Sequence, residues 1–215
     1  MYSKIVDELK SLADNKFAEW CKPFLSIKDD SQDLILGIRV PILRKLAKKY
    51  SNIDIKDLLK LLQNQYHEAR ALALFIMILK AKKEPEKMCE IYLDNIAYIN
   101  NWDLIDYTCP HIVAPKISQA KLLELANSKD LWSNRVAMVS TIYFIKKGDF
   151  KNALQFAEKF MTHPHHLMHK AAGWMLREIG KQDIKVLSDF LNKFSAQMPS
   201  VMKSYAQEHL RKLKL

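Results

Sequence analysis

Residues 66–82 read YHEARALALFIMILKAK, and this segment decides the fold class. Apolar side chains would surround a helix of this sequence on nearly every side, so we expect an internal helix rather than a surface one. Its uncharged centre, residues 71–79, lies between Arg70 and Lys80 and falls well short of the roughly 20 residues that cross a bilayer. The segment therefore predicts the buried centre of a helical protein, without a membrane span or a membrane partner.

Helix start and stop signals recur at short intervals on both sides of this segment. The expected helices span residues 42–50, 55–63, 66–82, 86–99, 119–126, 132–147, 150–161, 165–179 and 184–194, and a last helix begins at Pro199. The residues expected to begin or cap these helices are Pro41, Asp54, Pro85, Ser118, Asp149 and Asp183, and those expected to end two of them are Gly148 and Gly180. Residues 33–40 are the one candidate strand.

The apolar-rich helices recur with a loose period. They begin near Tyr66, Asn100, Leu131 and His165, a spacing of roughly 35 residues that is typical of stacked helical hairpins. A shorter amphipathic helix fits between successive members. Because the sequence has no linker rich in proline, glycine or serine, we predict a single all-α domain over residues 1–215, an α-solenoid that curves around a concave face.

The composition agrees with this fold class and indicates an anionic partner. The chain has 215 residues, of which 49% are hydrophobic and only 4 are glycine. The apolar fraction excludes a disordered chain, and the scarcity of glycine argues against an all-β fold, which needs frequent turns. Lysine and arginine number 34 against 24 acidic residues, which gives a formal net charge of +10. A polyanion is therefore the first class of partner to consider.

The N-terminus and the cysteines indicate a reducing compartment. Residues 1–10 include Asp7 and Glu8 and have no apolar segment of the kind that a secretory signal requires. Cys21, Cys89 and Cys109 are widely spaced and form no CxxC pair, so neither a disulfide framework nor a zinc knuckle is expected. We therefore expect a cytoplasmic protein.

Three segments carry an indole together with a charged side chain on the same helical face. These sets are Trp102 with Asp106, Trp132 with Arg135, and Lys170 with Trp174 and Arg177. Gly173 is expected to remove bulk beside the indole of Trp174. If the three faces line one concavity, they form a basic, aromatic groove that contains one acid. Such a groove suits nucleic acid, because cations neutralise phosphates and aromatic faces receive bases or sugars.

At these segments the sequence resembles the DNA alkylation repair enzymes, a family of HEAT-like-repeat alkylpurine DNA glycosylases. The resemblance covers essentially the whole chain and rests on LGIRVP (36–41), LRKLAK (43–48), HEAR (67–70), NWDLID (101–106), LWSNR (131–135) with Ala137, and HKAAGWMLRE (169–178). It implies an α-α superhelix of HEAT-like helical hairpin repeats whose concave face clamps duplex DNA. It also implies excision of purines alkylated at N3 or N7.

The resemblance assigns roles to individual residues. Asp106 matches the catalytic carboxylate, Trp102 and Trp174 match tryptophans that contact the sugar and the DNA backbone, and Arg135 matches an active-site arginine. The further residues expected to contact DNA are Arg39, Arg44, Lys45, Trp132, Lys170 and Arg177. A cationic base leaves without protonation, so no general acid is needed. No lysine is placed as an obvious Schiff-base nucleophile, so a monofunctional glycosylase without metal or cofactor is expected. A monomer is expected because a solenoid that wraps DNA needs no partner subunit.

The sequence departs from the family pattern where basic residues are often found. Asn134 precedes Arg135 in place of a second arginine, and Ser200 and Ser204 stand where related sequences often carry arginine. These departures keep two alternatives open. One is a non-catalytic protein that binds DNA structures or lesions, and the other is a protein-interaction scaffold, the common use of helical solenoids.

Structural interpretations of the same residues also stay open. Asp106 is able to cap a helix or to pair with Arg135 or Arg70, and Glu68 and Arg70 look like an interhelical ion pair. Trp20 is expected in the core. Cys89 is also expected in the core. The basic run Arg39, Arg44, Lys45, Lys48 and Lys49 is also consistent with a solvated face.

A histidine cluster near residue 165 invites a metal interpretation. Its members are His163, His165, His166 and His169. No carboxylate or cysteine close in sequence completes a ligand set, so we expect no metal there.

Overall fold

The computed structural model describes residues 1–25 and 33–213 and is helical throughout its regular secondary structure. The all-α expectation is therefore confirmed. The chain divides into two compact units, Met1–Ile112 and Val113–Leu215, and each is described by itself. In the described part of the chain, no helix combines the length and hydropathy that a bilayer-spanning segment requires.

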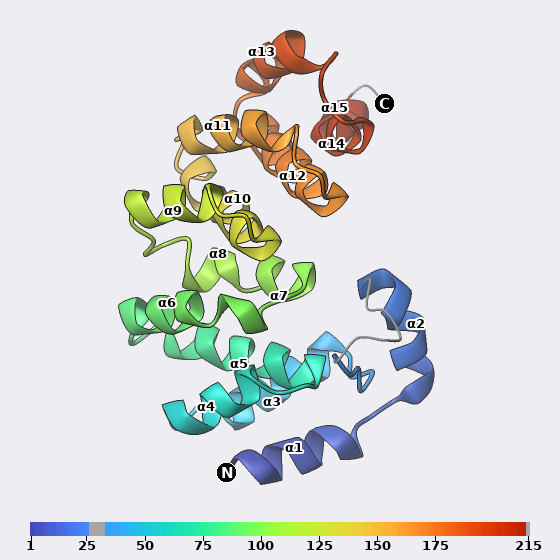
Figure 1. Ribbon diagram of the computed structural model, residues 1–215, viewed down its shortest axis with the longest axis vertical. Helices are drawn as coiled ribbons and strands as arrows, with labels where there is room; N and C mark the ends of the chain where they lie inside the picture. Colours follow the sequence, from blue (N-terminus) through green and yellow to red (C-terminus); the bar gives the residue numbers. More distant parts are fainter. Residues whose placement is uncertain (26–32, 214–215) are drawn as a thin grey trace. The chain divides into compact units, whose positions relative to one another are not determined.

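The N-terminal unit is built around one buried helix, α5 (Figure 1). Its helices are α1 (Tyr2–Ser11), α2 (Asn15–Leu25), α3 (Val40–Lys49), α4 (Ile55–Leu62), α5 (His67–Lys80), α6 (Pro85–Asp94), the 3-10 turn Ile96–Tyr98, α7 (Trp102–Asp106) and α8 (Cys109–Ile112). Helices α1, α3, α4, α6, α7 and α8 all contact α5. The side chains of Leu72, Leu74 and Ile76 on α5 are completely buried, as the apolar sequence of this segment predicts.

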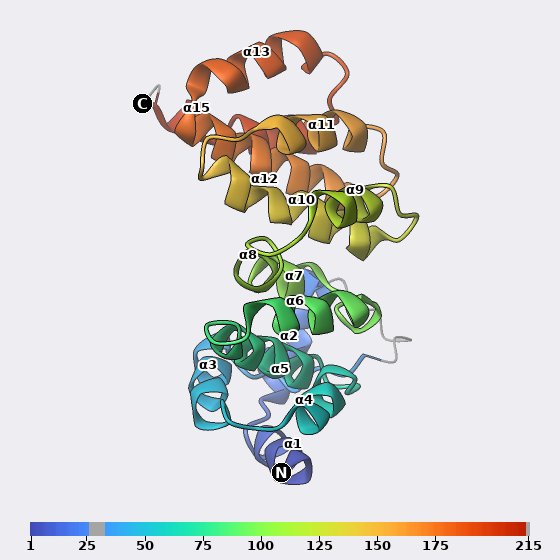
Figure 2. The same cartoon turned by 90° about the vertical axis from the view of Figure 1, so that its left-hand side faces the viewer.

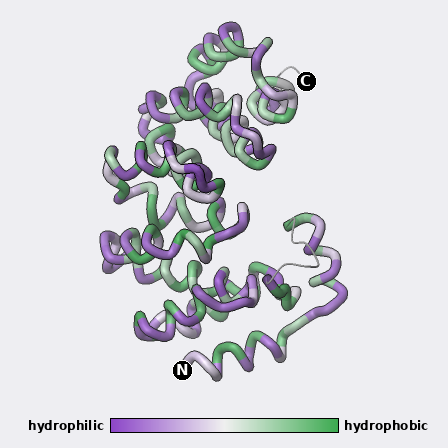
Figure 3. Tube along the Cα trace, viewed as in Figure 1, coloured by the Kyte–Doolittle hydropathy of each residue, from purple (hydrophilic) through white to green (hydrophobic). Residues whose placement is uncertain are grey.

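The C-terminal unit is organised in the same way around α12 (Figure 2). Its helices are α9 (Gln119–Ala126), α10 (Leu131–Ile145), α11 (Lys151–Phe160), α12 (His166–Gln182), α13 (Ile184–Phe194), α14 (Ser200–Ala206) and α15 (Glu208–Leu213). Helices α10, α11, α13, α14 and α15 contact α12. Figure 3 shows short apolar and hydrophilic stretches alternating along the helices of both units, as expected for helices that bury one face.

Most of the predicted helix caps are confirmed. The side chains of Asp54, Ser118 and Asp183 accept hydrogen bonds from backbone N–H groups in the first turns of α4, α9 and α13. The donor–acceptor distances are 2.7 Å from Asp57 N to Asp54 Oδ1 and 3.2 Å from Lys121 N to Ser118 Oγ. Each bond satisfies an N–H that the helix itself leaves without an acceptor.

Three predictions about helix boundaries and strands are wrong. Gly180 does not end a helix, because α12 continues to Gln182. A Cβ at position 180 would lie 2.3 Å from Leu187 Cδ2, so this glycine instead lets α13 approach α12. Residues 33–40 form no strand and make only an isolated bridge between Leu34 and Tyr66. The helix expected over 86–99 ends at Asp94 and is followed by a 3-10 turn.

Candidate functional site

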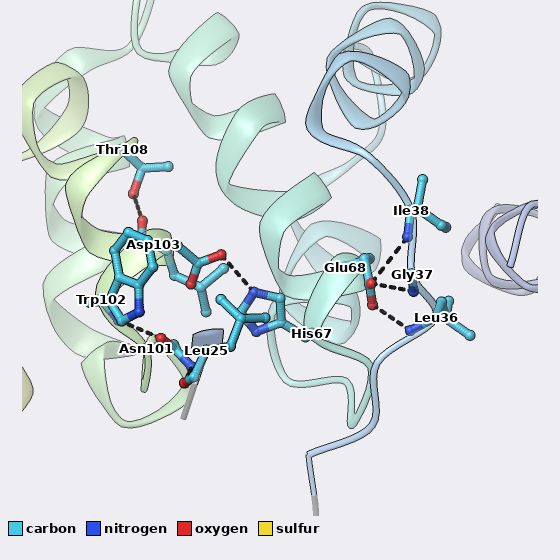
Figure 4. Close-up of polar contacts among 11 residues, drawn as sticks. Leu25, Leu36, Gly37, Ile38, His67, Glu68, Asn101, Trp102, Asp103 and Thr108 are labelled. Atoms are coloured by element: carbon cyan, nitrogen blue, oxygen red, sulfur yellow. Dashed lines mark hydrogen bonds and ion pairs between the residues drawn. The ribbon is translucent and has the colours of Figure 1, made fainter. Parts of the chain in front are cut away.

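Glu68 fixes the chain segment that was expected to form a strand. Its carboxylate is buried at the start of α5 and accepts three backbone N–H groups (Figure 4). The distances are 2.9 Å from Leu36 N, 2.7 Å from Gly37 N and 3.3 Å from Ile38 N. A carboxylate thus takes the place of a neighbouring strand as the acceptor for this backbone.

Arg70 has partners of its own rather than Glu68. Its Nη1 lies 2.9 Å from Asp33 Oδ1 and donates to the carbonyl oxygen of Asn64 at 2.9 Å. The interhelical Glu68–Arg70 ion pair expected from the sequence is therefore wrong. The two side chains stand two positions apart on α5 and point to different sides of the helix, because successive helical residues are separated by about 100°.

Gly37 holds this segment against the beginning of α2. Its φ is +80°, and a Cβ at this position would lie only 2.1 Å from the carbonyl oxygen of Asp14. Asp14 N also donates to Leu36 O at 2.8 Å. The left-handed conformation and the close backbone approach both require glycine, and together they fix where α2 begins.

The far end of α2 is tied to α7. Asn101 caps α7, because its Oδ1 accepts from Trp102 N at 2.8 Å, and its Nδ2 donates to Leu25 O at 2.9 Å. The ring of Phe24 packs edge-on against the indole of Trp102, with ring centroids 5.1 Å apart. Helix α2 is therefore held at both ends, which fixes the space between α2, α5 and α7.

His67, which is buried, pairs with the partly buried Asp103 in that space (Figure 4). His67 Nε2 lies 2.8 Å from Asp103 Oδ2, and the two side chains are 5% and 18% exposed. Because Nε2 faces a carboxylate, we assign the ring proton to it, which leaves Nδ1 as an acceptor in the neutral imidazole. Neither His67 Nδ1 nor Asp103 Oδ1 has a hydrogen-bond partner among the described residues.

An aromatic face lies along α2. Phe17, Trp20 and Phe24 are spaced at i, i+3 and i+7, and their successive ring centroids are 5.5 and 6.3 Å apart. Trp20 is 65% exposed and Phe24 is 61% exposed, so the expectation of a core position for Trp20 is wrong. The Arg39 guanidinium lies 4.0 Å from the centroid of Phe17, a cation–π contact at one end of this face.

These elements enclose a pocket with a volume of about 370 Å³, which we call the N-terminal pocket. Aromatic side chains of α2 and α7 form its walls, and His67, Glu68 and Asp103 contribute polar groups. Cys21 also lines it. Burial raises the pKa of the Cys21 thiol, and the charges of Glu68 and Asp103 raise it further.

Two of the predicted catalytic residues lie together on α7. Trp102 is the first residue of this helix and Asp106 the last, so they stand one turn apart, and both are partly exposed. Of the predicted DNA contacts in this unit, Arg39 immediately precedes α3, whereas Arg44 and Lys45 are exposed on it. The Arg44 guanidinium lies 5.6 Å from the ring centroid of Phe75.

The remaining predicted site residues belong to the C-terminal unit, where several are engaged by protein groups. Arg135 is buried, and its Nη1 donates to Leu167 O at 2.7 Å. Trp174 Nε1 donates to Glu178 Oε1 at 3.1 Å. Arg177 pairs with Glu178 and with Glu208. Trp132 and Lys170 are partly exposed.

Two sequence features of this unit have packing explanations. Asn134 is buried, and its Nδ2 donates to the carbonyl oxygens of Leu125 and Ser128, each at 2.9 Å. A Cβ at Gly173 would lie 2.5 Å from Met202 O, so this glycine makes room for α14 and not, as the sequence had indicated, for the indole of Trp174.

Sequence reasoning missed the N-terminal pocket. It did not single out Phe17, Phe24 or Asp103, and it gave Trp20 and Glu68 structural roles. The available signal was the i, i+3, i+7 spacing of three large aromatic residues on one short helix. Among the described residues, no group of three or more histidine, cysteine or acidic side chains is arranged to hold a metal ion.

Comparisons with known proteins identify the family. A family model described as DNA alkylation repair enzyme matches residues 5–210. No curated protein matches the sequence. A predicted DNA alkylation repair enzyme from Enterococcus faecalis has a similar fold, with a TM-score of 0.74 at 15% identity over 93% of this chain and 97% of that chain.

A second solved structure has a similar fold. AlkD2 from Streptococcus mutans has a TM-score of 0.59 at 15% identity over 90% of this chain and 97% of that chain. At such low identity the two structures show a shared fold, whereas the family model covers nearly the whole sequence. The chain therefore belongs to the DNA alkylation repair enzyme family.

Proposed function

We propose that this protein is a monofunctional DNA N-glycosylase that hydrolyses the glycosidic bond of purines alkylated at N3 or N7 in duplex DNA. The observation that carries the proposal is the placement of Trp102 and Asp106 one turn apart on α7, both accessible to solvent, in a chain of this family. The net charge of +10 favours binding to a polyanion.

The reaction requires little from the protein besides electrostatic stabilisation of the transition state. An alkylated purine that is already cationic leaves without a general acid, and the sugar passes through an oxocarbenium-like state. Asp106 stabilises that positive charge and orients the attacking water, and the indole of Trp102 contributes a cation–π contact. Catalytic roles are also proposed for Arg135 and Trp174 of the C-terminal unit, and no metal or cofactor is proposed.

Binding to the duplex is proposed to use three exposed cations, two partly exposed cations and one further indole. The residues proposed to contact DNA are Arg39, Arg44, Lys45, Trp132, Lys170 and Arg177. We propose that the protein acts as a monomer in the cytoplasm. Cys21, Cys89 and Cys109 form no disulfide, and burial raises the pKa of Cys89 to about 11, which fits thiols that stay protonated.

The test compares release of methylated bases from duplex DNA by wild type and Asp106→Asn. We expect release to fall at least about 100-fold, because a charge that stabilises the transition state is lost. DNA binding should be unchanged or tighter, because a negative charge near phosphates is removed. Asp94→Asn, which neutralises an exposed carboxylate on α6 of the same unit, is the matched control. An unchanged rate in Asp106→Asn would refute the role of Asp106.

A non-catalytic lesion-binding protein is the second candidate. The observation in its favour is that the guanidinium groups of Arg135 and Arg177 already bind protein groups within the C-terminal unit. This candidate predicts salt-sensitive DNA binding with base release at the spontaneous rate. The same base-release assay distinguishes the two candidates.

A further inference from the structure

We propose that Glu208 of α15 competes with duplex DNA for the guanidinium of Arg177, so that α15 restrains DNA binding until a phosphate displaces this carboxylate. The inference rests on the proposed function in one respect, which is that DNA is the ligand. It concerns Glu208, a residue to which the proposed catalysis gives no role.

The competition takes place at one nitrogen atom of Arg177. This residue lies on the same face of α12 as Lys170, seven positions earlier, and Trp174, three positions earlier. Its Nη1 contacts Glu208 Oε2, whereas its Nε lies 3.5 Å from Glu178 Oε1. Two carboxylates therefore face a cation that is proposed to bind a phosphate.

The two carboxylates are held to different extents. Glu178 belongs to α12 itself, and its Oε1 accepts from Trp174 Nε1 at 3.1 Å and from Lys181 Nζ at 2.7 Å. The side chain of Glu178 is 17% exposed, whereas that of Glu208 is 42% exposed. Glu178 is thus fixed by its own helix, and Glu208 is the carboxylate that can turn into water when an anion approaches.

Glu208 reaches Arg177 through the packing of the last helices. It is the first residue of α15 and stands 31 positions after Arg177 in the sequence. Helix α15 contacts both α12 and α14 (Figure 1). The close approach of α14 to α12 at Gly173, together with the single residue Gln207 between α14 and α15, places Glu208 beside Arg177.

A phosphate group is able to take the place of the Glu208 carboxylate. Guanidinium groups form charge-assisted hydrogen bonds with carboxylate and phosphate oxygens in the same planar geometry. When a phosphate oxygen replaces Glu208 Oε2 at Nη1, Glu178 remains near Nε and keeps the guanidinium oriented. Because one ion pair is broken for each one formed, Arg177 adds less to DNA affinity than an arginine without such a competitor would.

The first test measures binding of an undamaged duplex to the full-length protein over a series of salt concentrations. Glu208→Gln should bind about two- to fivefold more tightly than wild type, the range that partly exposed ion pairs contribute. It should also steepen the dependence of log affinity on log salt by about one, because the phosphate contact no longer costs an ion pair.

The matched control is Glu158→Gln, which neutralises an exposed carboxylate on α11 of the same unit. This variant should leave the salt dependence unchanged. Glutamine at position 208 keeps the length of the side chain and an oxygen that accepts from Arg177 Nη1, so α15 should stay in place, and the urea midpoint checks this. Affinity and salt dependence in Glu208→Gln equal to those of the control would overturn the proposal.

A double-variant cycle separates competition for Arg177 from general repulsion of DNA by a carboxylate. In an Arg177→Gln background, Glu208→Gln should change the affinity no more than Glu158→Gln does, because the cation for which Glu208 competes is gone. An equal gain with and without Arg177 would show that Glu208 acts through general repulsion and would overturn the proposal.

The outcomes separate this proposal from the glycosylase proposal. Tighter, Arg177-dependent binding in Glu208→Gln without base release by wild type would retain the competition and refute the enzyme. Base release that depends on Asp106, with Glu208→Gln indistinguishable from Glu158→Gln in DNA binding, would retain the enzyme and overturn the competition. Absence of duplex binding at low salt by both wild type and Glu208→Gln would overturn it as well.

Discussion

Helices α7 and α12 carry similar residues but leave them in different states. Each has a tryptophan one turn from a carboxylate, Trp102 with Asp106 on α7 and Trp174 with Glu178 on α12. On α12 the polar groups are paired with one another, since Glu178 accepts from Trp174 and from Lys181. Each helix also has a buried polar atom without a hydrogen-bond partner among the described residues, Asp103 Oδ1 on α7 and His169 Nε2 on α12, but only Asp103 lines the N-terminal pocket.

The packing explains this difference. Helix α12 is 17 residues long and packs against several helices, which bring partners such as Glu208 to its charged side chains. Helix α7 has 5 residues and borders a pocket, so fewer protein groups reach it. An indole beside a carboxylate is therefore a more specific sign of a candidate site when its helix also borders a pocket.

The largest expected effect compares one glycine from each unit. Gly37 and Gly148 both have a φ of +80°, but only Gly37 has backbone atoms where a Cβ would lie. Gly37→Ala should lower the free energy of unfolding by about 3–5 kcal/mol, from strain plus overlap with Asp14 O. Gly148→Ala should lose about 1–2 kcal/mol from strain alone. Urea unfolding of both variants measures this, and equal losses would show that the close approach at Gly37 is unimportant.

Removal of the Glu178 carboxylate, which accepts from Trp174 and Lys181 on α12, should have an intermediate effect on the free energy of unfolding. Glu178→Ala leaves the indole N–H of Trp174 and the Lys181 ammonium without their acceptor and should lower the free energy of unfolding by about 1–2 kcal/mol. Glu158→Ala, at an exposed position of α11, is the control and should change it by less than about 0.5 kcal/mol. A loss in Glu178→Ala no greater than in the control would mean that this network is not stabilising.

A smaller effect is expected from pH in the C-terminal unit. Burial lowers the pKa values of His163 and His165 below the usual 6.5. The unfolded chain then binds protons more readily than the folded one, so stability present above about pH 6.5 falls as the pH decreases through the lowered values. Protonation of His165 also removes the acceptor for Leu167 N.

Urea midpoints at a series of pH values measure this dependence. Asparagine at both positions retains a side-chain oxygen acceptor without titrating in this range, so the double variant His163→Asn, His165→Asn should have a flatter profile than wild type. A profile identical to that of wild type would assign the pH dependence to other groups.

The smallest effect is expected from an exposed pair in the N-terminal unit. Hydrogen bonds from Lys49 and Tyr50 lower the pKa of Glu8 below 4.5. The stabilisation that the ionised Glu8 carboxylate gives to the folded state is therefore present above about pH 4.5 and is lost as the pH falls through the lowered pKa. Glu8→Gln should cause a small decrease in melting temperature at low salt that vanishes at high salt, because exposed pairs are screened. A decrease that persists at high salt would indicate a packing role for Glu8.

The sequence was sufficient for those features that depend on neighbours along the chain. Asp54, Ser118 and Asp183 were recognisable as caps because a cap bonds the backbone two or three residues ahead. The nearly continuous apolar sequence of residues 71–79 identified α5 for the same kind of reason. By contrast, Gly173 and Gly180 were misinterpreted, because each makes room for a helix that follows later in the chain.

Features of the candidate site also differ in whether they depend on local spacing or on contacts between distant positions. The spacing of four residues was sufficient to predict that Trp102 and Asp106 lie one turn apart on a helix, as they do on α7. The N-terminal pocket was not found, because it depends on contacts across the sequence, such as Glu68 with Gly37 and His67 with Asp103. Nor does spacing along a helix reveal that Arg135 is buried against Leu167 O.

The sequence by itself determined the helical fold class, the caps and the net charge, and it supplied the candidate residues for contact with DNA. All of these follow from composition and from interactions within a few residues. Only the tertiary structure decided which polar groups are paired and which border a pocket. The reason is that pairing depends on side chains brought together from distant positions, and the free energy of a buried polar group depends on whether such a partner arrives.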